Sequence, residues 1–133
     1  ILASIIEKET ARASERRLVS AVYTNRLKRG MPLQADPTTI YPITRGKSLG
    51  RRILRSELAA ENGYNTYRRS GLPIGPIANP GKASIEAALD PAPSNALFFV
   101  AQGDGSSAFA DTLEQHNANV QKWYAHRRAK GEM

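Results

Sequence analysis

Cysteine is absent from this 133-residue chain, and histidine occurs only twice, as His116 and His126. Without cysteine the chain has no disulfide, no thiolate metal ligand and no thiol nucleophile. No carboxylate cluster accompanies either histidine, so the sequence gives little support for a metal site. It also contains no phosphate-binding loop, no dinucleotide-binding glycine pattern and no nucleophile elbow. We therefore expect a protein that uses neither metal nor cofactor, and nucleophilic hydrolysis is disfavoured.

Long apolar runs are missing as well. No stretch approaches the roughly 20 apolar residues that a membrane-spanning helix needs, and no signal-peptide pattern is present. The sequence has no initial methionine and opens inside an apolar helical pattern. We therefore expect residues 1–133 to be one domain taken from a longer protein. A domain of this length buries roughly two-thirds of its unfolded surface in a single core.

Acidic residues are the scarcer charged type: 12 Asp and Glu stand against 19 Lys and Arg, a formal net charge of +7. This excess favours an anionic partner, whether nucleic acid, acidic lipid or a carboxylate-bearing polymer. A nucleic-acid-binding surface would gather the cations on one face with aromatic residues between them. Here they are spread along the whole chain, so nucleic acid is disfavoured.

Hydrophobic periodicity and capping residues predict a mainly helical chain with one hairpin, and hence an α+β domain. The predicted helices are 2–10, 14–29 with Ser14 as N-cap, a short helix capped by Asp36 and ended by Pro42, 53–60, 82–89, and 113–128 after a Thr112/Gln115 capping box. The predicted strands are 97–101 and 107–110, joined by a turn. Residues 44–52 are expected to be an exposed loop. Residues 71–81 hold three prolines and three glycines between Leu72, Ile74 and Ile77, and we expect an ordered, partly buried loop.

Glu9 is the candidate catalytic residue. On a helix over residues 2–10, it falls on the same apolar stripe as Ile5 and Ile6, whereas Glu7 falls on the opposite, small and polar side. Desolvation by isoleucines raises the pKa of a carboxyl group, and a carboxyl group that keeps its proton near neutral pH can act as a general acid. Taken alone, the pattern favours the ordinary alternative, in which Glu9 reaches water or pairs with an arginine such as Arg12 or Arg16, so the catalytic interpretation needs support from elsewhere in the chain.

Several blocks of sequence, taken together and in order, carry a resemblance to a known family. They are LASIIEKET (2–10), ASER (13–16), NRL (25–27) with Gly30-Met31, LQADPTTIY (33–41), YNTY (64–67), GLPIGPIANPG (71–81), residues 98–105 and His116-Asn117. In these blocks the chain resembles the catalytic domain of the MltG-type (YceG-like) endolytic murein transglycosylases over nearly its whole length. The resemblance implies a lysozyme-like catalytic domain.

The family resemblance implies an enzyme of the bacterial cell envelope. Its members cleave peptidoglycan between N-acetylmuramic acid and N-acetylglucosamine without water and leave a 1,6-anhydro end, which terminates glycan strands. The resemblance therefore implies glycan strands as substrate, cell-wall synthesis proteins as further partners, an extracytoplasmic location and a membrane anchor N-terminal to this sequence. It also places the family's catalytic glutamate at Glu9, the residue that the helical pattern selects independently.

The substrate-binding residues implied by the resemblance are Gln34, Asp36, Tyr64, Asn65, Thr66 and Tyr67. The structural alternatives are that Asp36 serves simply as a helix cap, that Asn65 and Thr66 form the hydrogen bonds of a turn, and that Tyr67 packs in the core. For His116 and Asn117 we favour a role in pinning a loop. The chain departs from the family pattern at Ile74, where a second proline is common, and at Ser107, where histidine is common, so we assign no function to Ser107. A non-catalytic basic module that binds peptidoglycan or nucleic acid remains the alternative.

Overall fold

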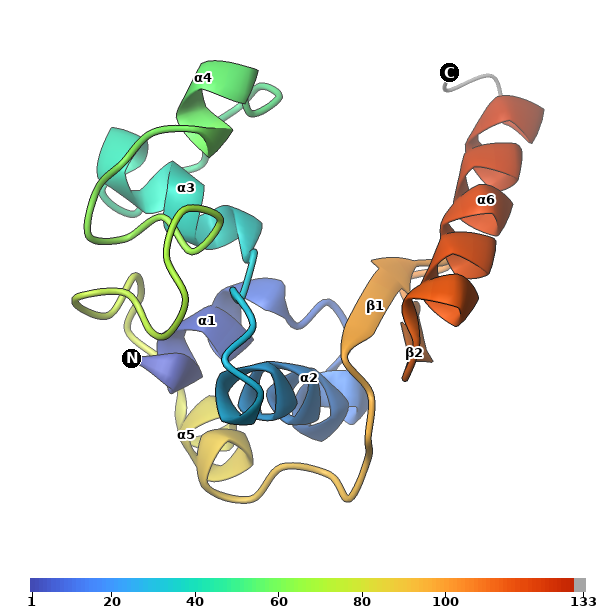
Figure 1. The fold of residues 1–133 in the computed structure, drawn as a ribbon, viewed down its shortest axis with the longest axis horizontal. Coiled ribbons are helices and arrows are strands. Elements are labelled where there is room, and N and C mark those ends of the chain that lie inside the picture. The colour runs from blue at the N-terminus through green and yellow to red at the C-terminus, as the bar shows by residue number, and fades with distance from the viewer. Residues whose placement is uncertain (131–133) are drawn as a thin grey trace.

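Helices dominate the structure, and a single hairpin of two antiparallel strands interrupts them (Figure 1). The computed structural model describes residues 1–130. Its elements are α1 (Leu2–Glu9), the 3₁₀ helix η1 (Ala13–Glu15), α2 (Arg16–Lys28), α3 (Asp36–Thr44), α4 (Arg55–Leu58), α5 (Lys82–Leu89), β1 (Phe98–Ala101), β2 (Ser107–Ala110) and α6 (Leu113–Ala129). The predicted α+β class is confirmed. Within residues 1–130 no helix combines the length and apolarity needed to cross a membrane.

The core forms where α1 packs between its neighbours. α1 contacts α2, α3 and α5, and its Ile5 and Ile6 are completely buried. The core cluster comprises Ile5, Val19, Tyr23, Leu33, Ala35 and Ile77. Ser4 is also buried, and its hydroxyl accepts a hydrogen bond from the Ile77 backbone amide at 3.1 Å. This bond fixes the proline-rich loop against α1, so the predicted ordered loop is found.

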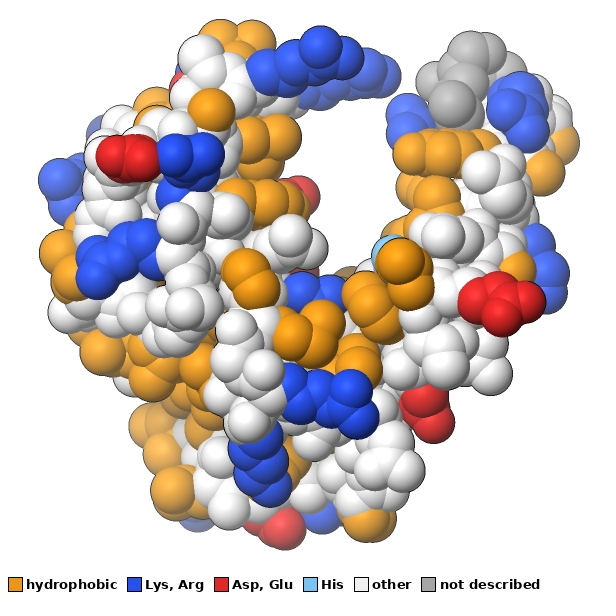
Figure 2. Space-filling view, viewed as in Figure 1, with side chains coloured by type: hydrophobic (Ala, Val, Ile, Leu, Met, Phe, Trp, Pro, Cys, Tyr) orange, Lys and Arg blue, Asp and Glu red, His pale blue; other side chains and the backbone are white. Residues whose placement is uncertain are grey.

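Two groups of elements rise from this core and leave a hollow between them. α3 and α4 with their loops stand on one side, and α6 stands on the other, carried by the hairpin (Figure 1). The hairpin pairs Phe99 with Phe109 and Val100 with Ala108. The space-filling view shows the hollow open to solvent, with apolar side chains along its walls and arginine or lysine side chains at its mouth and floor (Figure 2).

Three expected helix boundaries are wrong. Ser14 lies within η1, and α2 follows directly with Glu15 as its N-cap, because the Glu15 amide already closes a tight turn on Arg12. Asp36 is the first residue of α3, so the N-cap is Ala35, with no side-chain bond. Pro42 lies inside α3, which continues to Thr44 because a proline removes only one N–H donor and the Arg45 amide still bonds to Tyr41.

Candidate active site

A cleft of about 270 Å³ opens at the foot of the hollow, where the end of α1, the middle of α2, the start of α3, β1 and α6 meet. Four of the sequence-predicted residues line it: Glu9, Gln34, Asp36 and Tyr67. Tyr64, Asn65 and Thr66 do not. The structure therefore separates the predicted set into residues that face the cleft and residues behind or away from it.

Glu9 ends α1 and directs its carboxyl group into the cleft. Burial first, and then the nearby charge of Asp36, raise the pKa of this carboxyl group to about 7, against the opposing effect of a hydrogen bond from the Tyr23 side chain. No ion pair to Arg12 or Arg16 forms among residues 1–130. Glu9 is thus mostly protonated in mildly acidic solution and about half protonated near pH 7.

Asp36 and Tyr67 form a pair beside Glu9. The Tyr67 hydroxyl donates a hydrogen bond to Asp36 Oδ1, which joins the start of α3 to the YNTY segment. Burial first, and then this bond, raise the pKa of Tyr67. Because Asp36 accepts from a tyrosine that stays protonated, its carboxylate is held in a fixed position at the wall of the cleft.

Gln34 reaches the cleft through an unusual backbone conformation. Its φ is +50°, in the left-handed region that non-glycine residues rarely adopt. The neighbouring Leu33 and Ala35 are buried, while Gln34 is exposed. Thr66 supports this segment on the side away from the cleft. The backbone amide of Gln34 donates to the Thr66 carbonyl, and the backbone amide of Ala35 donates to the Thr66 hydroxyl at 3.0 Å.

Thr66 and Asn65 are structural residues in this arrangement. Both are 1% exposed. The Thr66 hydroxyl also bonds to the Thr38 hydroxyl at 2.8 Å, so it acts on the cleft only through the backbone that it supports. The Asn65 side-chain amide donates to the carbonyls of Leu58 and Ala60 at 3.0 and 2.7 Å, and its oxygen accepts from the Tyr67 amide. Substrate contact by Asn65 or Thr66 is therefore not supported by the geometry.

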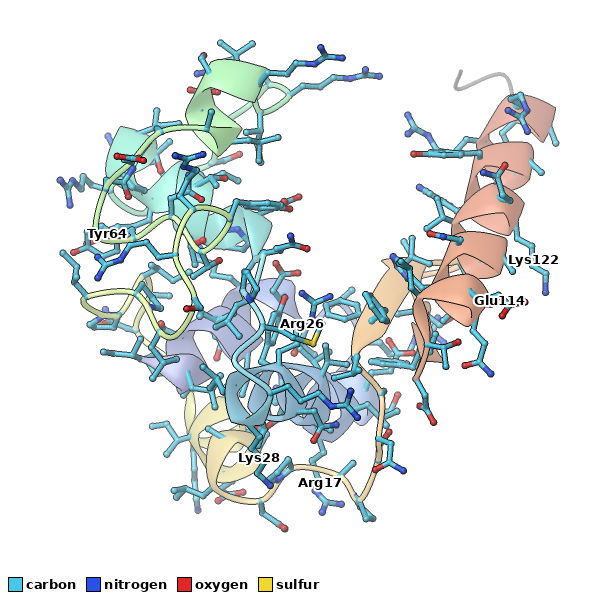
Figure 3. All side chains as sticks on the ribbon, viewed as in Figure 1. Arg17, Arg26, Lys28, Tyr64, Glu114 and Lys122 are labelled. Carbon is cyan, nitrogen blue, oxygen red and sulfur yellow. The ribbon has the colours of Figure 1, made fainter. Side chains whose placement is uncertain are left out.

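Tyr64 belongs to another surface. Its ring packs against Tyr41 with 4.9 Å between centroids, and Arg45 lies over both rings. Figure 3 shows Tyr64 on the loop beside α3, whereas Arg26 lies near the centre of the molecule between α2 and β1. Tyr64 thus faces away from the cleft that contains Glu9.

The sequence interpretation missed Arg26, a buried cation in the floor of the cleft. Its Nε donates to the Leu97 carbonyl at 2.7 Å and its Nη1 to the Pro32 carbonyl at 2.9 Å. Burial lowers the pKa of this guanidinium. The available signal was its helical position, because Arg26 lies three and four residues after Tyr23 and Val22 on the apolar stripe of α2.

His116 also lines the cleft rather than pinning a loop. Its ring stacks on Phe98 with 4.9 Å between centroids and 20° between planes, and the Arg26 guanidinium lies 5.0 Å from the centre of the same Phe98 ring. Burial and the charge of Arg26 lower the pKa of His116, so the imidazole is neutral at pH 7. Its neighbour Asn117 is exposed. Phe98 therefore holds His116 in the wall of the cleft by stacking, which the sequence could not indicate.

Glu7 lies two residues before Glu9 and makes contacts of a different kind. Its Oε1 accepts hydrogen bonds from the Gly81 amide at 2.8 Å and from the Ser84 hydroxyl at 3.0 Å, at the start of α5. These bonds lower the pKa of Glu7. Among residues 1–130 no cluster of three or more His, Asp and Glu side chains could hold a metal ion.

The comparisons with known proteins agree on one family. The model of the YceG-like family matches residues 1–122. The chain is 40% identical over 129 residues to a Bacillus subtilis protein named endolytic murein transglycosylase, and 37% identical over 125 residues to a protein of the same name from Streptococcus pneumoniae strain D39. These matches cover 97% and 90% of this chain, but only 35% and 22% of the two relatives.

A solved structure gives the same result. The fold is similar to that of a YceG-like protein from Listeria monocytogenes, with a TM-score of 0.77 and 42% sequence identity, over 88% of this chain and 36% of that chain. Together with the family match over residues 1–122, this similarity shows that the chain belongs to the YceG-like family.

Proposed function

We propose that this chain is the catalytic domain of an endolytic peptidoglycan lytic transglycosylase. The single observation that carries the proposal is the placement of Glu9, a carboxyl group with a pKa of about 7 in a cleft lined by aromatic, amide and hydroxyl side chains. Such a site suits sugars, which present both apolar faces and hydroxyl groups. The names of the relatives from Bacillus and Streptococcus support the same reaction class.

The proposed reaction uses Glu9 twice. Protonated Glu9 gives its proton to the glycosidic oxygen as the bond from that oxygen to C1 of N-acetylmuramic acid breaks, and N-acetylglucosamine leaves with a hydroxyl group. The Glu9 carboxylate then takes the proton of the muramic acid C6 hydroxyl, whose oxygen attacks C1. The product is a 1,6-anhydro ring, no water is consumed, and Glu9 is protonated again for the next cycle.

A pKa near the working pH suits this double role. An acid with an ordinary glutamate pKa would be ionised before it met the substrate, and one with a much higher pKa would yield its proton reluctantly. Asp36 contributes its negative charge to this setting, and Tyr67 fixes the position of Asp36. Gln34 supplies an amide to the same cleft, suited to hydrogen bonding with a sugar hydroxyl or acetamido group.

The same proposal sets the location and the partners. An enzyme that cuts peptidoglycan works in the bacterial cell envelope, outside the cytoplasm. We propose that cleavage terminates glycan strands near the proteins that synthesise them, and that a segment N-terminal to this sequence anchors the protein at the membrane.

The experiment that tests the function is digestion of purified peptidoglycan in ¹⁸O-labelled water, followed by mass spectrometry. The expected product carries a muramic acid end that is one water lighter than the hydrolysed form and contains no ¹⁸O. A reducing end with stoichiometric label would show a hydrolase, which needs a second carboxylate to activate water. Binding without any cleavage would instead show a non-catalytic peptidoglycan-binding module.

A further inference from the structure

A second hollow, of about 580 Å³, is separate from the cleft and shares none of its lining residues. Its walls come from the end of α1, the end of α3 and the proline-rich loop, including Lys8, Tyr41, Arg45 and Ile77. A further hollow of about 350 Å³ shares Lys8, Tyr41 and Ile77 and extends the surface along α3 to Ile40 and Leu49. We treat the two as one groove and call it the α3 groove. Nothing in the proposed reaction uses it.

Arg45 is held in place at the edge of the α3 groove. Its guanidinium carbon lies 5.4 Å from the centre of the Tyr41 ring and 5.8 Å from that of Tyr64. Its backbone amide donates a hydrogen bond to the Tyr41 carbonyl at 2.8 Å. Arg45 itself has a φ of +56°, and this left-handed conformation ends α3. A side chain that rests on two tyrosine rings loses less conformational freedom on binding a ligand than a free arginine does.

The charges of the α3 groove favour an anion. Lys8, Arg45 and Lys47 line it, and none of them forms an ion pair within the part of the chain that the structure describes. The one acidic residue in its lining is Glu7, whose Oε1 is occupied by the amide of Gly81 and the hydroxyl of Ser84. Ile40, Leu49 and Ile77 add apolar surface between the cations. The groove therefore suits a ligand with carboxylates and small apolar side chains.

We propose that the α3 groove binds the peptide stem that muramic acid carries in peptidoglycan, with Arg45 and Lys8 holding the stem's carboxylates. The inference rests on the proposed function, which supplies the polymer. The stem is a short peptide with alanine methyl groups, free carboxylates and one diamino acid residue. Its carboxylates are complementary to the cations of the groove, and its methyl groups to the apolar side chains. A four-residue peptide spans about 13 Å when extended.

The cleft and the groove are lined by residues that adjoin one another in the chain. Glu9 lines the cleft and the adjacent Lys8 lines the groove, while Asp36 lines the cleft and the adjacent Pro37 lines the groove. A stem that leaves a sugar bound beside Glu9 or Asp36 would thus meet groove residues that adjoin them in the chain. The groove would then distinguish peptide-bearing strands from bare ones.

The first test measures binding without catalysis. Acetyl-L-Ala-γ-D-Glu-L-Lys-D-Ala is titrated into the ¹⁵N-labelled 133-residue chain and followed by NMR. The expected shift changes lie at Gly46 and at Ile77 to Asn79, and Arg45→Gln weakens binding about tenfold, the effect of losing one charged hydrogen bond. The control Arg55→Gln removes an exposed arginine of α4 outside the groove and leaves the affinity unchanged. Absence of binding, or equal binding of the same peptide with both carboxylates amidated, would overturn the proposal.

The second test uses the reaction itself. With peptide-bearing glycan strands, Arg45→Gln and Lys8→Gln are expected to raise KM and leave kcat nearly unchanged, whereas strands stripped of peptide by an amidase show no change in either constant. An equal change with both substrates would contradict a stem site. If the chain cleaves neither substrate, the proposed function fails, while the peptide titration still decides whether the groove binds the stem.

Discussion

Glu7 and Glu9 are the same residue type, two positions apart on α1, and the structure gives them opposite properties. Glu7 accepts hydrogen bonds from Gly81 and Ser84 at the start of α5, and its pKa is lowered. Glu9 is partly buried in the cleft beside Asp36, and its pKa is raised to about 7. One carboxylate joins two helices and the other keeps a proton. The surroundings that each helical face meets, rather than the residue type, determine the chemistry.

The largest expected difference between the two is in activity. Glu9→Gln removes the transferable proton and keeps the shape of the side chain, so we expect turnover of peptidoglycan to fall by about 10²–10⁴-fold. Glu7→Gln is the matched control and should retain most of the activity of the folded protein. Release of anhydro-muropeptides, measured by mass spectrometry, reports both. An inactive Glu7→Gln beside an active Glu9→Gln would exchange their roles.

The stability of the protein should respond to pH in opposite directions at the two positions. Glu9 keeps its proton in the folded state up to about pH 7 but loses it near 4.5 when unfolded, so its contribution to stability declines as pH rises from 4.5 through 7. At about 1.4 kcal/mol per pKa unit the total is at most about 3.5 kcal/mol. Glu9→Gln should therefore unfold at a higher urea concentration than wild type at pH 8.

Glu7 supplies the internal comparison for this measurement. Its pKa is lowered in the folded state, so its stabilising contribution is present above the unfolded value of 4.5 and is lost as pH falls. Glu7→Gln should accordingly weaken the protein at pH 8 and have little effect at acidic pH. Parallel pH profiles for the two variants would contradict the contrast.

The YNTY segment repeats the contrast between structural and cleft residues on a smaller scale. Asn65→Ala leaves the carbonyls of Leu58 and Ala60 without their donor inside the protein, and we expect a loss of about 2–3 kcal/mol in the free energy of unfolding. Tyr67→Phe removes only the bond to Asp36 and should lower activity more than stability. Thermal melts and kcat of the folded fraction separate the two effects. A stable but inactive Asn65→Ala protein would instead indicate that Asn65 contacts the substrate.

The smallest predicted effect sharpens the account of Glu9 itself. Asp36→Asn removes the negative charge that helps to raise the pKa of Glu9, so the alkaline limb of the pH profile of kcat/KM should move to lower pH. The pKa reported by this limb should stay above that of an ordinary glutamate, because burial is the larger cause of the raised pKa of Glu9. A limb that does not move would show that Asp36 acts only through its bond to Tyr67.

The fold was predictable because its signals are local. The apolar stripe of α1, the Thr112 cap of α6 and the glycines between the two strands each specify an element within a few residues. Pro42 misled the prediction of α3, since a proline marks a cost rather than a boundary, and packing of the surrounding turn outweighs that cost.

The cleft was predictable only in part, because its contacts join distant segments. Glu9 stands out on a helical wheel because it shares a stripe with Ile5 and Ile6, although the residues that line the cleft around it come from other elements. Nothing in the sequence shows that Asn65 satisfies carbonyls near residue 60, or that Phe98 carries the ring of His116. A polar residue type predicts that a hydrogen bond forms, but only the structure identifies the partner.

The backbone conformation of Gln34 matters for any attempt to raise the thermal stability of this protein. Its left-handed backbone costs a side-chain-bearing residue about 1 kcal/mol, and a design procedure that scores stability alone would replace it with glycine or asparagine. Glycine would remove the side-chain amide from the wall of the cleft, and asparagine would shorten its reach by one methylene. At this position, therefore, a change that relieves backbone strain also alters the cleft, so stability and activity place opposing demands on the same residue.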